Sequence, residues 1–401
     1  MNHLLLLVIL ILGLLLLGGL EGLRHRRSLA RIPIRIHVNG TRGKSSVTRL
    51  IAGGLRAGGI STCAKTTGTK ACLILPDGAE YPIYRPSRAN IIEQVRIVDA
   101  AADTGAEVLV VECMALHPLL QSLSELRLVR ATHGVITNVR ADHLDVMGPS
   151  EADVALAFAG AIPRHGTLFS AADRHQDILE YAAADRDCEV VTVEAEEIEA
   201  VSNDDLNGFS YLEHRSNVAL ALRVCEAMGV DRKTALRGMW EAQPDPGVLT
   251  VHEMEFFGRR LLFANALAAN DPESTERIWR TVLDQVPDVE RRIALFNCRL
   301  DRPDRSLQLG EACTRWPPAD YYVLMGTGTF IFARAATRAG LDSRKLIMAE
   351  NEDPRAVFET LVECSGRAAL IMGMGNIHGG GEDLARLFDN RGTPRMLHTW
   401  S

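Results

Sequence analysis

The chain has 401 residues, of which 47% are hydrophobic and 24% are charged, a composition that excludes a disordered chain. Its length exceeds the about 250–300 residues beyond which a single core stops growing, so two domains are expected. The net charge of −7, from 44 basic and 51 acidic residues, argues against a nucleic-acid partner, because phosphate binding needs an excess of Lys and Arg.

An apolar segment opens the chain at residues 4–20, LLLLVILILGLLLLGGL, which are 17 residues without a charge. At about 1.5 Å per residue, such a helix just reaches the lower limit for a membrane span. Arg24, Arg26 and Arg27 follow it, so the positive-inside rule places the rest of the chain on the cytoplasmic side. A cleaved secretory signal is the alternative, but its usual basic start and small-residue cleavage site are missing. We therefore expect a single-pass anchor in the cell membrane with cytoplasmic catalytic domains.

The eight cysteines are scattered and include no CxxC pair. This usage favours reduced, mostly buried thiols over a disulfide framework. Reduced thiols agree with a cytosolic location of the residues that follow the apolar segment.

A strand-to-helix turn follows the apolar segment. Residues 34–38 alternate as in a strand, and apolar residues recur at helical spacing over 47–55. Between them lies GTRGKSS (40–46), where the first N–H groups of the helix converge on one point. Lys44 adds a full positive charge, and Ser45 places a hydroxyl where a phosphate-bound Mg²⁺ needs an oxygen ligand. The loop is shorter than the usual P-loop, and an ordinary basic surface loop is the alternative.

Strand-like apolar runs alternate with helical patterns along the remaining chain. The runs lie at residues 34–38, 107–113, 134–139, 188–193, 260–267, 291–298, 321–328 and 368–375. This alternation predicts βα units and mostly parallel sheets, and the turn-rich QPDPGV at 243–248 marks a domain boundary. We predict an α/β fold with a transmembrane helix over 1–23, a P-loop-containing, mostly parallel sheet domain over 24–245, and a smaller Rossmann-like α/β domain over 246–401.

Polar residues end two strand-like runs of the first domain, at the edge of a parallel sheet where ligands bind. Glu112 ends VLVVE, and it either lines the cleft or forms a strand-end salt bridge with a structural Arg. Asp142, His143 and Asp145 follow ITNV (136–139). His143 is either a ligand of Mg²⁺ or Mn²⁺ or a structural histidine.

The first run of the second domain ends in a further polar group. Asn265, Asn270 and Asp271 close it. These residues either lie at the edge of the sheet where ligands bind or begin a helix. In the second case Asp271 would cap that helix and Pro272 would lie in its first turn.

Several motifs occur in one order along the chain: GTRGKSS, a strand ending in Glu112, TNVRADHLD (137–145), EHRSNVALAL (213–222) and, in the second domain, CRLDRPDRS (298–306). This order resembles the Mur ligase superfamily of ATP-dependent amide ligases. A leucine-rich anchor running directly into the ATP-binding strand, without a UDP-sugar-binding domain, is most similar to the ligase subunit of bacterial poly-γ-glutamate synthases, the PgsB/CapB type. The segment AKTTGTKA (64–71) also fits that type.

The resemblance implies ATP and Mg²⁺ as cofactors, with Mn²⁺ as the alternative ion. Nucleotide-binding residues would be Asn39, Gly40, Thr41, Arg42, Gly43, Lys44, Ser45, Ser46, His214 and Asn217. Asn217 would contact the adenine, and a helix cap is its alternative role. Ser45 and Glu112 would hold the first metal ion and His143 a second. Lys44, His143 and Arg302 would be catalytic.

Glutamate and the growing polyglutamate chain are the substrates that the resemblance implies, joined through γ-linked amide bonds by way of an acyl phosphate. Substrate-binding residues would be Thr66, Thr67, Gly68, Thr69 and Lys70. The membrane and membrane-protein partners of a synthase and export complex would be further partners. A ligase acting on folate or a cell-wall precursor, and a P-loop assembly factor without ligase activity, are the competing hypotheses.

The chain departs from the family pattern in two places. Phe158 stands where many of these ligases have a carbamylated lysine that bridges a second metal ion, and the second domain opens with AANDP (268–272) instead of Tyr-Ala-His-Asn-Pro. A second metal site is therefore uncertain from the sequence. The glycine-rich GMGNIHGGGEDL (373–384) is expected to be a loop, and contact with product or nucleotide is its alternative role.

Overall fold

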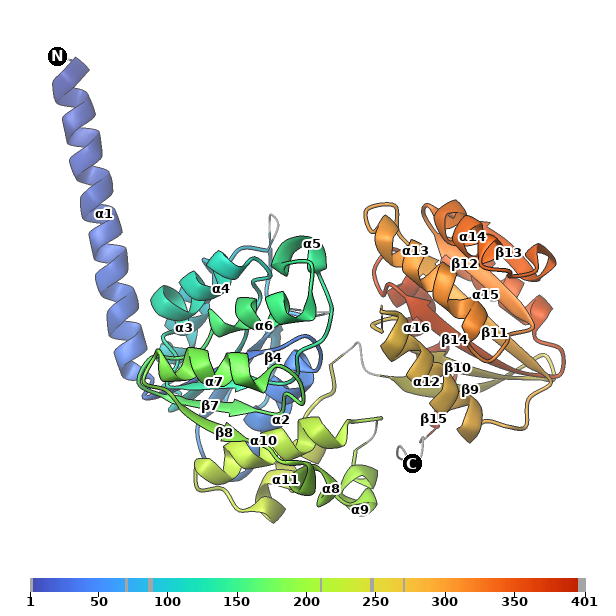
Figure 1. Ribbon diagram of the computed structural model, residues 1–401, viewed down its shortest axis with the longest axis horizontal. Coiled ribbons are helices and arrows are strands. Elements are labelled where there is room, and N and C mark those ends of the chain that lie inside the picture. Colours follow the sequence, from blue (N-terminus) through green and yellow to red (C-terminus); the bar gives the residue numbers. More distant parts are fainter. Residues whose placement is uncertain are drawn as a thin grey trace. The chain divides into compact units, whose positions relative to one another are not determined.

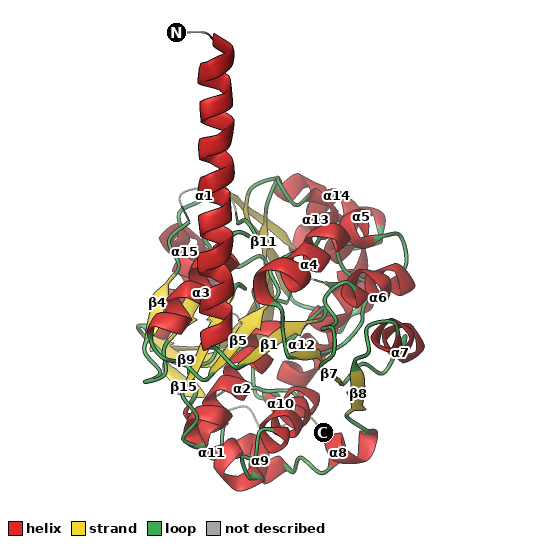
Figure 2. Ribbon diagram, turned by 90° about the vertical axis from the view of Figure 1, so that its left-hand side faces the viewer, coloured by secondary structure: helices red, strands yellow, loops and turns green. Residues whose placement is uncertain are grey.

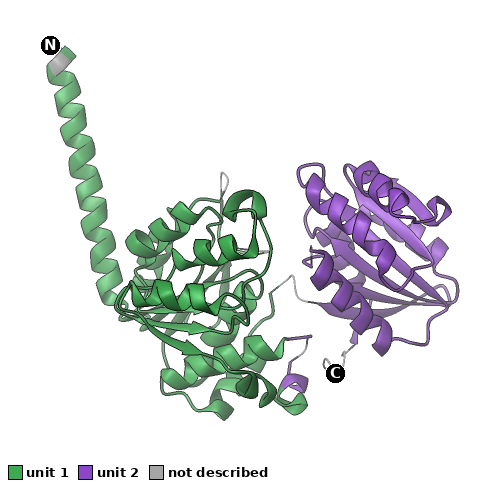
Figure 3. Ribbon diagram, viewed as in Figure 1, with its two compact units in different colours: residues 1–205, 214–245 green, residues 206–213, 246–401 purple. Residues whose placement is uncertain are grey.

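The computed structural model describes residues 3–68, 71–85, 89–209, 211–245, 249–269 and 271–395. It divides into two compact units (Figure 3). Unit 1 comprises Met1–Asp205 and His214–Asp245, and unit 2 comprises Leu206–Glu213 and Pro246–Ser401. Residues 246–248 of the turn-rich boundary segment lie outside the described residues. The domain boundaries expected from the sequence stay a prediction.

The first helix, α1 (His3–Arg31), is apolar over its first part and packs on unit 1 with its last turns. It is long and apolar enough to cross a membrane, and it extends away from the rest of unit 1 (Figure 1; Figure 2). Its last turns contact α3 (Glu93–Asp103), where the Ser28 hydroxyl donates a 2.9 Å hydrogen bond to Asp99 and Leu29 is buried. The helix therefore continues without a break across the predicted end of the anchor.

Unit 1 contains an eight-stranded sheet with the order β4-β3-β2-β5-β1-β6-β7-β8. Its strands are β1 (Ile34–Asn39), β2 (Thr62–Thr66), β3 (Cys72–Ile74), β4 (Glu80–Pro82), β5 (Val108–Glu112), β6 (His133–Ile136), β7 (Thr167–Ser170) and β8 (Glu189–Thr192). Neighbouring strands from β2 to β8 pair in parallel, and β3 and β4 form an antiparallel edge. Every residue of β5 is buried, as in a strand covered on both faces. The predicted mostly parallel sheet is confirmed.

Further helices of unit 1 pack on this sheet or on one another. They are α2 (Lys44–Ala57), α4 (Pro118–Leu123), a π-helical turn (Ser124–Val129), α5 (Leu144–Met147), α6 (Glu151–Ala159), α7 (Gln176–Ala184), α8 (Ala195–Glu199), α10 (Arg215–Ala227) and α11 (Arg232–Glu241), with α9 (Asn203–Asn207) leading into unit 2. Helix α2 crosses α11 at Gly53 and Gly238. A Cβ atom on Gly238 would lie 2.2 Å from the Gly53 carbonyl oxygen, so this crossing requires glycine.

Unit 2 contains a seven-stranded sheet with the order β13-β12-β11-β14-β10-β9-β15. Its strands are β9 (Thr250–Phe256), β10 (Arg259–Asn265), β11 (Arg291–Cys298), β12 (Tyr321–Gly326), β13 (Leu346–Glu350), β14 (Ala368–Gly375) and β15 (Thr393–Arg395). The five strands from β13 to β10 are parallel, and β9 and β15 are antiparallel. The second α/β domain that the sequence predicts is confirmed as a fold.

Alternating side chains of β10 build two cores in unit 2, one on each face of the sheet. Leu262 lies in a cluster with Trp279 and Phe332, whereas Phe263 lies in a cluster with Phe388. The helices that cover the sheet are α12 (Pro272–Gln285), α13 (Pro303–Ala312), α14 (Thr329–Arg338), α15 (Pro354–Cys364) and α16 (Gly381–Asp389). Because helices cover both faces of the sheet, polar residues can lie at the strand ends rather than on the faces.

All eight cysteines are free, and all but Cys364 are buried. The expected reduced, mostly buried thiols are confirmed.

Candidate active site

The glycine-containing segment GTRGKSS forms the turn between β1 and α2. β1 ends at Asn39 and α2 begins at Lys44, with Gly43 at its N-terminal cap in the left-handed conformation at φ 80°. The first N–H groups of α2 have no partners within the helix, and its dipole adds partial positive charge at this end. The turn therefore has the geometry of an anion-binding site.

Residues after β6 hold this loop in place. Thr41 N donates to the Asn138 carbonyl at 3.1 Å, and Arg42 N donates to the Asn138 side chain at 3.1 Å. The Thr137 hydroxyl donates to the Arg42 carbonyl at 2.5 Å. The prediction that 136–139 is a strand is thus wrong after Ile136, because the Asn138 carbonyl bonds to the loop instead of extending the sheet.

Two glycines of the loop have no room for a side chain. A Cβ atom on Gly40, at φ +129°, would lie 2.1 Å from the Thr137 hydroxyl. A Cβ atom on Gly43 would lie 2.7 Å from the Asn217 side-chain oxygen. Asn217, which is buried on α10, thus lies directly against the loop, and His214 stands at the N-cap position of the same helix.

Lys44 folds over the loop in this structure. Its ammonium group donates to the carbonyl oxygens of Gly40, at 2.6 Å, and Thr41, at 3.1 Å. Burial lowers the pKa of Lys44, and the charge of the nearby Glu112 carboxylate opposes that shift. The Lys44 amine thus lies at the mouth of α2, close to an acidic side chain.

Ser45 and Glu112 form the centre of the site. The Ser45 hydroxyl donates to Glu112 Oε2 at 2.9 Å, and the backbone N–H of Thr67 donates to the same oxygen at 2.6 Å. A Cβ atom on Gly68 would lie 2.5 Å from the Ser45 hydroxyl, and Thr66 is buried at the end of β2. Two of the predicted substrate residues, Thr67 and Gly68, therefore adjoin the predicted metal ligands, while residues 69–70 lie outside the described residues.

The oxygen atoms of Ser45 and Glu112 fit a hard divalent cation. Mg²⁺ prefers oxygen ligands and is often held by one or two carboxylates, with phosphate oxygens and water completing its shell. Within the described ranges, no group of three or more His, Cys, Asp and Glu residues is placed to hold a metal ion. The donor set therefore fits an ion that arrives with a phosphate-bearing ligand rather than a closed structural site.

His143 reaches the loop through Asp142. Its Nε2 lies 3.9 Å from the Asp142 carboxylate, which pairs with the Arg42 guanidinium at 3.3 Å. His143 itself has a left-handed backbone at φ 49° and begins α5. The position expected for the family's carbamylated lysine differs, because Phe158 is buried in the core of unit 1. A second metal ion held by His143 stays a prediction.

In unit 2, Asp271 has the structural role that the sequence left open. Its carboxylate accepts a 2.9 Å hydrogen bond from Ser274 N at the start of α12, with Pro272 in the first turn. Arg302 is exposed and precedes the first turn of α13. Asn270 lies outside the described residues. Part of the segment expected to be a glycine-rich loop instead forms the end of β14 and the start of α16.

Sequence reasoning missed a buried charged residue beside the site. Lys65 is fully buried on β2 and pairs with Glu93 at 2.9 Å, and Glu93 also accepts from Arg85 at 2.6 and 2.9 Å. Burial lowers the pKa of Lys65, and Glu93 opposes that shift. Its place in the chain gave no sign of this role, because the acidic partner comes from a helix about thirty residues away in sequence.

Two family models match the chain. "Mur ligase middle domain" covers residues 38–239, and "Poly-gamma-glutamate synthase CapB C-terminal domain" covers residues 251–391. The chain is 36% identical to the Capsule biosynthesis protein CapB of Bacillus anthracis over 92% of its own length and 80% of that protein. The chain belongs to the CapB family of Mur ligases. It is also 35% identical to the PGA synthase CapB of Bacillus subtilis, over 92% of this chain and 94% of that CapB protein.

A solved structure shares the fold of this CapB family member. It is the bifunctional folylpolyglutamate synthase/dihydrofolate synthase from Yersinia pestis, complexed with AMPPNP and Mn ion. The TM-score is 0.68 at 13% identity, and the alignment covers 91% of this chain and 92% of that chain. At this identity the likeness concerns the fold alone.

Proposed function

We propose that this chain polymerises glutamate through γ-linked amide bonds, using ATP and an acyl-phosphate intermediate. Membership of the CapB family and of the Mur ligases supports an ATP-dependent amide ligase. The observation that carries the proposal is the cluster at the mouth of α2, where Lys44, Ser45, Glu112 and Thr67 meet. This cluster joins a phosphate-binding turn to a carboxylate and to the segment expected to bind substrate.

In the proposed reaction, a γ-carboxylate oxygen attacks the γ-phosphorus of ATP. The bond from that phosphorus to the ADP oxygen breaks, and a mixed anhydride forms. The amine of the next glutamate attacks the anhydride carbon and loses a proton, and phosphate leaves with the oxygen it took from the carboxylate. Because both reactants are anions, the protein must chiefly supply positive charge and position.

The chain's own residues can provide this charge. The N–H groups at the start of α2 and the Lys44 ammonium would bind the β- and γ-phosphates. Lys44 would exchange its bonds to the carbonyl oxygens of Gly40 and Thr41 for bonds to phosphate oxygens. Arg302 of unit 2 is proposed as a further phosphate ligand.

Ser45 and Glu112 would hold a divalent cation, proposed as Mg²⁺ with Mn²⁺ as the alternative, and His143 is proposed for a second ion. When bound, such an ion neutralises phosphate charge and orients the oxygens for in-line displacement. Thr67 N, by bonding to Glu112, fixes the carboxylate in position.

Adenine and substrate contacts complete the proposal. Asn217 and His214 of α10 would border the nucleotide, which is supported by the close approach of Asn217 to Gly43. Residues 66–70 would bind the glutamyl carboxylate. Gly68 in that segment already lies beside Ser45.

The apolar part of α1 is proposed as a single-pass membrane anchor with the catalytic units on the cytoplasmic side. Length and composition support a span, and a signal sequence near an N-terminus would meet the same criteria. Membrane proteins of a synthase and export complex are the proposed partners.

A panel of acceptors separates this function from its rivals. ADP release and amide product are measured with L-glutamate, D-glutamate, a folate, a cell-wall precursor and no acceptor. The proposal expects ADP release that requires glutamate and matches the amide formed. Turnover that depends on folate or the precursor would favour those ligase activities, and turnover indifferent to every acceptor would favour a nucleotide-binding assembly factor.

A further inference from the structure

The direction of α1 decides which edge of unit 1 faces the proposed membrane. Contacts between α1 and α3 advance together along both helices. The Ser28 hydroxyl bonds to Asp99, and in the next turn Arg31 bonds to Asp103 at 3.0 Å. The two helices therefore run in the same direction. The N-terminus of α3 lies towards the apolar part of α1, and Figures 1 and 2 show α3 and α4 on that side of unit 1.

The catalytic residues lie on the same side. Glu93, the first residue of α3, pairs at 2.9 Å with Lys65, close to the end of β2. The N-terminus of α3 therefore lies at the carboxyl edge of the sheet. The strands β1 and β5, which are parallel to β2, also end at this edge, in the phosphate loop and Glu112.

The length of β1 gives the height of this edge along α1. The chain turns between α1 and β1, so β1 runs back towards the apolar part of α1. From Ile34 to Asn39 the strand rises about 17 Å, as far as about 11 residues of an α-helix. Counted back from Arg31, this distance places the phosphate loop about level with Leu20, where the apolar stretch ends.

Helix α4 has an inverted pattern for a helix that faces water. Its polar Gln121 is buried, as is Ser124 in the π-helical turn that follows, whereas its leucines are exposed. The exposed fractions are 61% for Leu119, 40% for Leu120 and 39% for Leu123. In water the apolar side of a helix turns inwards instead. A leucine face over buried polar groups therefore favours an apolar environment for α4.

These leucines adjoin the proposed anchor. α4 follows β5, so its first turn lies near the carboxyl edge, and the π-helical turn after it contacts α1, where His25 Nε2 lies 2.9 Å from the Leu128 carbonyl oxygen. Ile92, at the N-cap of α3, adds a large apolar side chain that is 59% exposed. Arg26 and Arg27 are exposed on α1 just after its apolar stretch, where lipid phosphates would lie.

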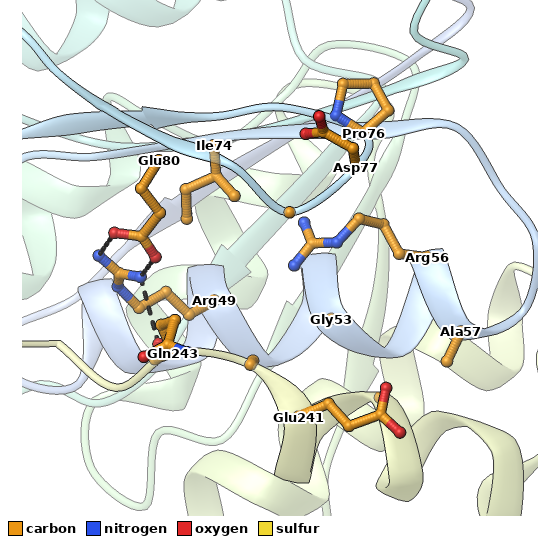
Figure 4. A pocket seen from close by; sticks show the side chains of 13 residues that line it. Arg49, Gly53, Arg56, Ala57, Ile74, Pro76, Asp77, Glu80, Glu241 and Gln243 are labelled. Atoms are coloured by element: carbon orange, nitrogen blue, oxygen red, sulfur yellow. Dashed lines mark hydrogen bonds and ion pairs between the residues drawn. The ribbon is translucent and has the colours of Figure 1, made fainter.

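The surface along α2 has a different character. A recess there is bordered by α2, the β3–β4 hairpin and the end of α11, and its lining includes Arg49, Asp77, Glu80 and Glu241 (Figure 4). Arg49 Nη2 donates to Glu80 Oε2 at 3.1 Å. Contact with lipid would take such charges out of water at a high cost in free energy. The side that carries α3 and α4 is therefore the one that suits a bilayer.

We propose that the carboxyl edge of unit 1 rests on the lipid bilayer through an apolar surface beside α1. This surface comprises Ile92, Leu119, Leu120 and Leu123, which enter the boundary between headgroups and acyl chains. Interfacial helices bury their apolar side chains about 5–10 Å deep in this boundary. The inference rests on the proposed anchor, because α1 holds the surface at the membrane, and it is independent of the ligase chemistry. The phosphate loop then opens close to the bilayer.

Fluorescence quenching by lipids tests this contact in the full chain. The chain is reconstituted into phosphatidylcholine bilayers whose lipids carry a quencher at the first acyl carbons. A thiol-reactive fluorophore is attached at Leu120→Cys in a Cys364→Ser background, since the other native cysteines are buried. Quenching there is expected to be at least about threefold stronger than at Tyr181→Cys, an exposed position in the second half of α7. Equal quenching at the two positions would overturn the proposal.

A fluorophore at Leu12→Cys, in the apolar part of α1, separates failure of the anchor from failure of the bilayer contact. Quenching at Leu12 but not at Leu120 would keep the anchor and refute the contact. No quenching at either position would refute both. Protection of Leu120 from the lipid quencher and from dissolved iodide would show that protein, such as a second copy of the chain, covers the surface, and would refute the contact with lipid.

Matched variants test whether the leucines make the contact. Leu119→Gln combined with Leu123→Gln is expected to reduce the quenching of a fluorophore at Ile92→Cys by at least about twofold, because less apolar area enters the bilayer. The control Leu156→Gln, at a leucine of α6 that is 58% exposed, should leave that quenching unchanged. All the replaced leucines are exposed, so the melting temperature in detergent should be kept. Unchanged quenching at Ile92 in the double variant would contradict the proposal.

Discussion

The hydroxyl of Ser45 donates a 2.9 Å hydrogen bond to the carboxylate of Glu112, although 67 positions separate the two residues in sequence. Strand pairing brings them together: β1 and β5 are parallel neighbours with Val38 opposite Glu112, and the loop after β1 returns Ser45 to the end of β5. The pair therefore arises from the order of strands in the sheet rather than from any local motif.

Glu112→Gln is expected to raise the concentration of Mg²⁺ or Mn²⁺ that half-saturates ADP release by about tenfold or more. The amide can still accept hydrogen bonds from Ser45 and Thr67, but it loses the charge that attracts the ion. Titrating the metal ion against initial rates measures the effect. Glu107→Gln, exposed just before the other end of β5, is the matched control. An unchanged metal requirement in Glu112→Gln would contradict the assigned ligand.

Gly43→Ala should weaken ATP binding and destabilise unit 1 by about 1–3 kcal/mol, because φ +80° is strained for alanine and the added Cβ would meet Asn217. Combining it with Asn217→Gly removes the overlap but not the backbone strain. We expect a partial recovery of stability in the double variant relative to the sum of the two single changes. Denaturant unfolding and nucleotide titration of the four proteins measure it.

Gly40→Ala provides the contrast. Its Cβ would lie 2.1 Å from the Thr137 hydroxyl and 2.9 Å from the Thr137 backbone nitrogen. Removing the hydroxyl with Thr137→Ala leaves the backbone contact, so little recovery is expected. Equal recovery of stability in the two double variants would mean that the loop adjusts freely, which would contradict its tight packing against Thr137 and Asn217.

The raised pKa of His37 predicts how the free energy of unfolding depends on pH. Burial alone would lower the pKa of this histidine, but the nearby Cys113 and the 2.8 Å contact with Glu125 raise it to about 10 from 6.5. The folded chain then holds a proton that the unfolded chain releases. The stabilisation is present in full below pH 6.5 and is lost as the pH rises to about 10, at up to about 1.4 kcal/mol per pH unit.

Urea unfolding across that pH range checks the sign. The free energy of unfolding of the wild type should fall with rising pH, and His37→Gln should remove much of this slope. A wild-type stability that rises over the same interval would show that His37 is neutral in the folded chain.

Local pattern predicted much of the site. The β1–loop–α2 unit follows from apolar periodicity on both sides of a glycine-containing turn, and Glu112 stood out as a carboxylate that ends an apolar run. Such signals need only neighbouring residues. The structure added the contacts that join them, from Ser45 to Glu112 and from Asn217 to Gly43.

Other features depend on distant partners and so escaped prediction. β2 was missed because its sequence TCAKT lacks apolar alternation, and its buried Lys65 is stabilised by Glu93 from another element. β6 ends at Ile136 because the backbone of Asn138 bonds to the loop. Neither the presence of β2 nor the end of β6 could be derived from strand propensity, since tertiary hydrogen bonds decide both.

Deleting residues 1–20 tests the proposed anchor. The contacts of Ser28 and Leu29 with unit 1 remain, so the shortened chain should fold, stay in solution without detergent and keep its ADP release. Deleting residues 1–31 should lower the melting temperature, because those contacts are lost. Recovery of the full chain in the soluble fraction, or N-terminal sequencing that starts after the apolar segment, would contradict a retained anchor.

The proposed reaction depends most on the acyl phosphate formed at the phosphate loop, and labelled oxygen follows that intermediate directly. With oxygen-18 in the γ-carboxylate of glutamate, the wild type should transfer one labelled oxygen to phosphate for each amide bond made. Lys44→Ala should release almost no phosphate, while Lys233→Ala, an exposed lysine of α11, should match the wild type. Unlabelled phosphate released together with amide product would contradict the mechanism.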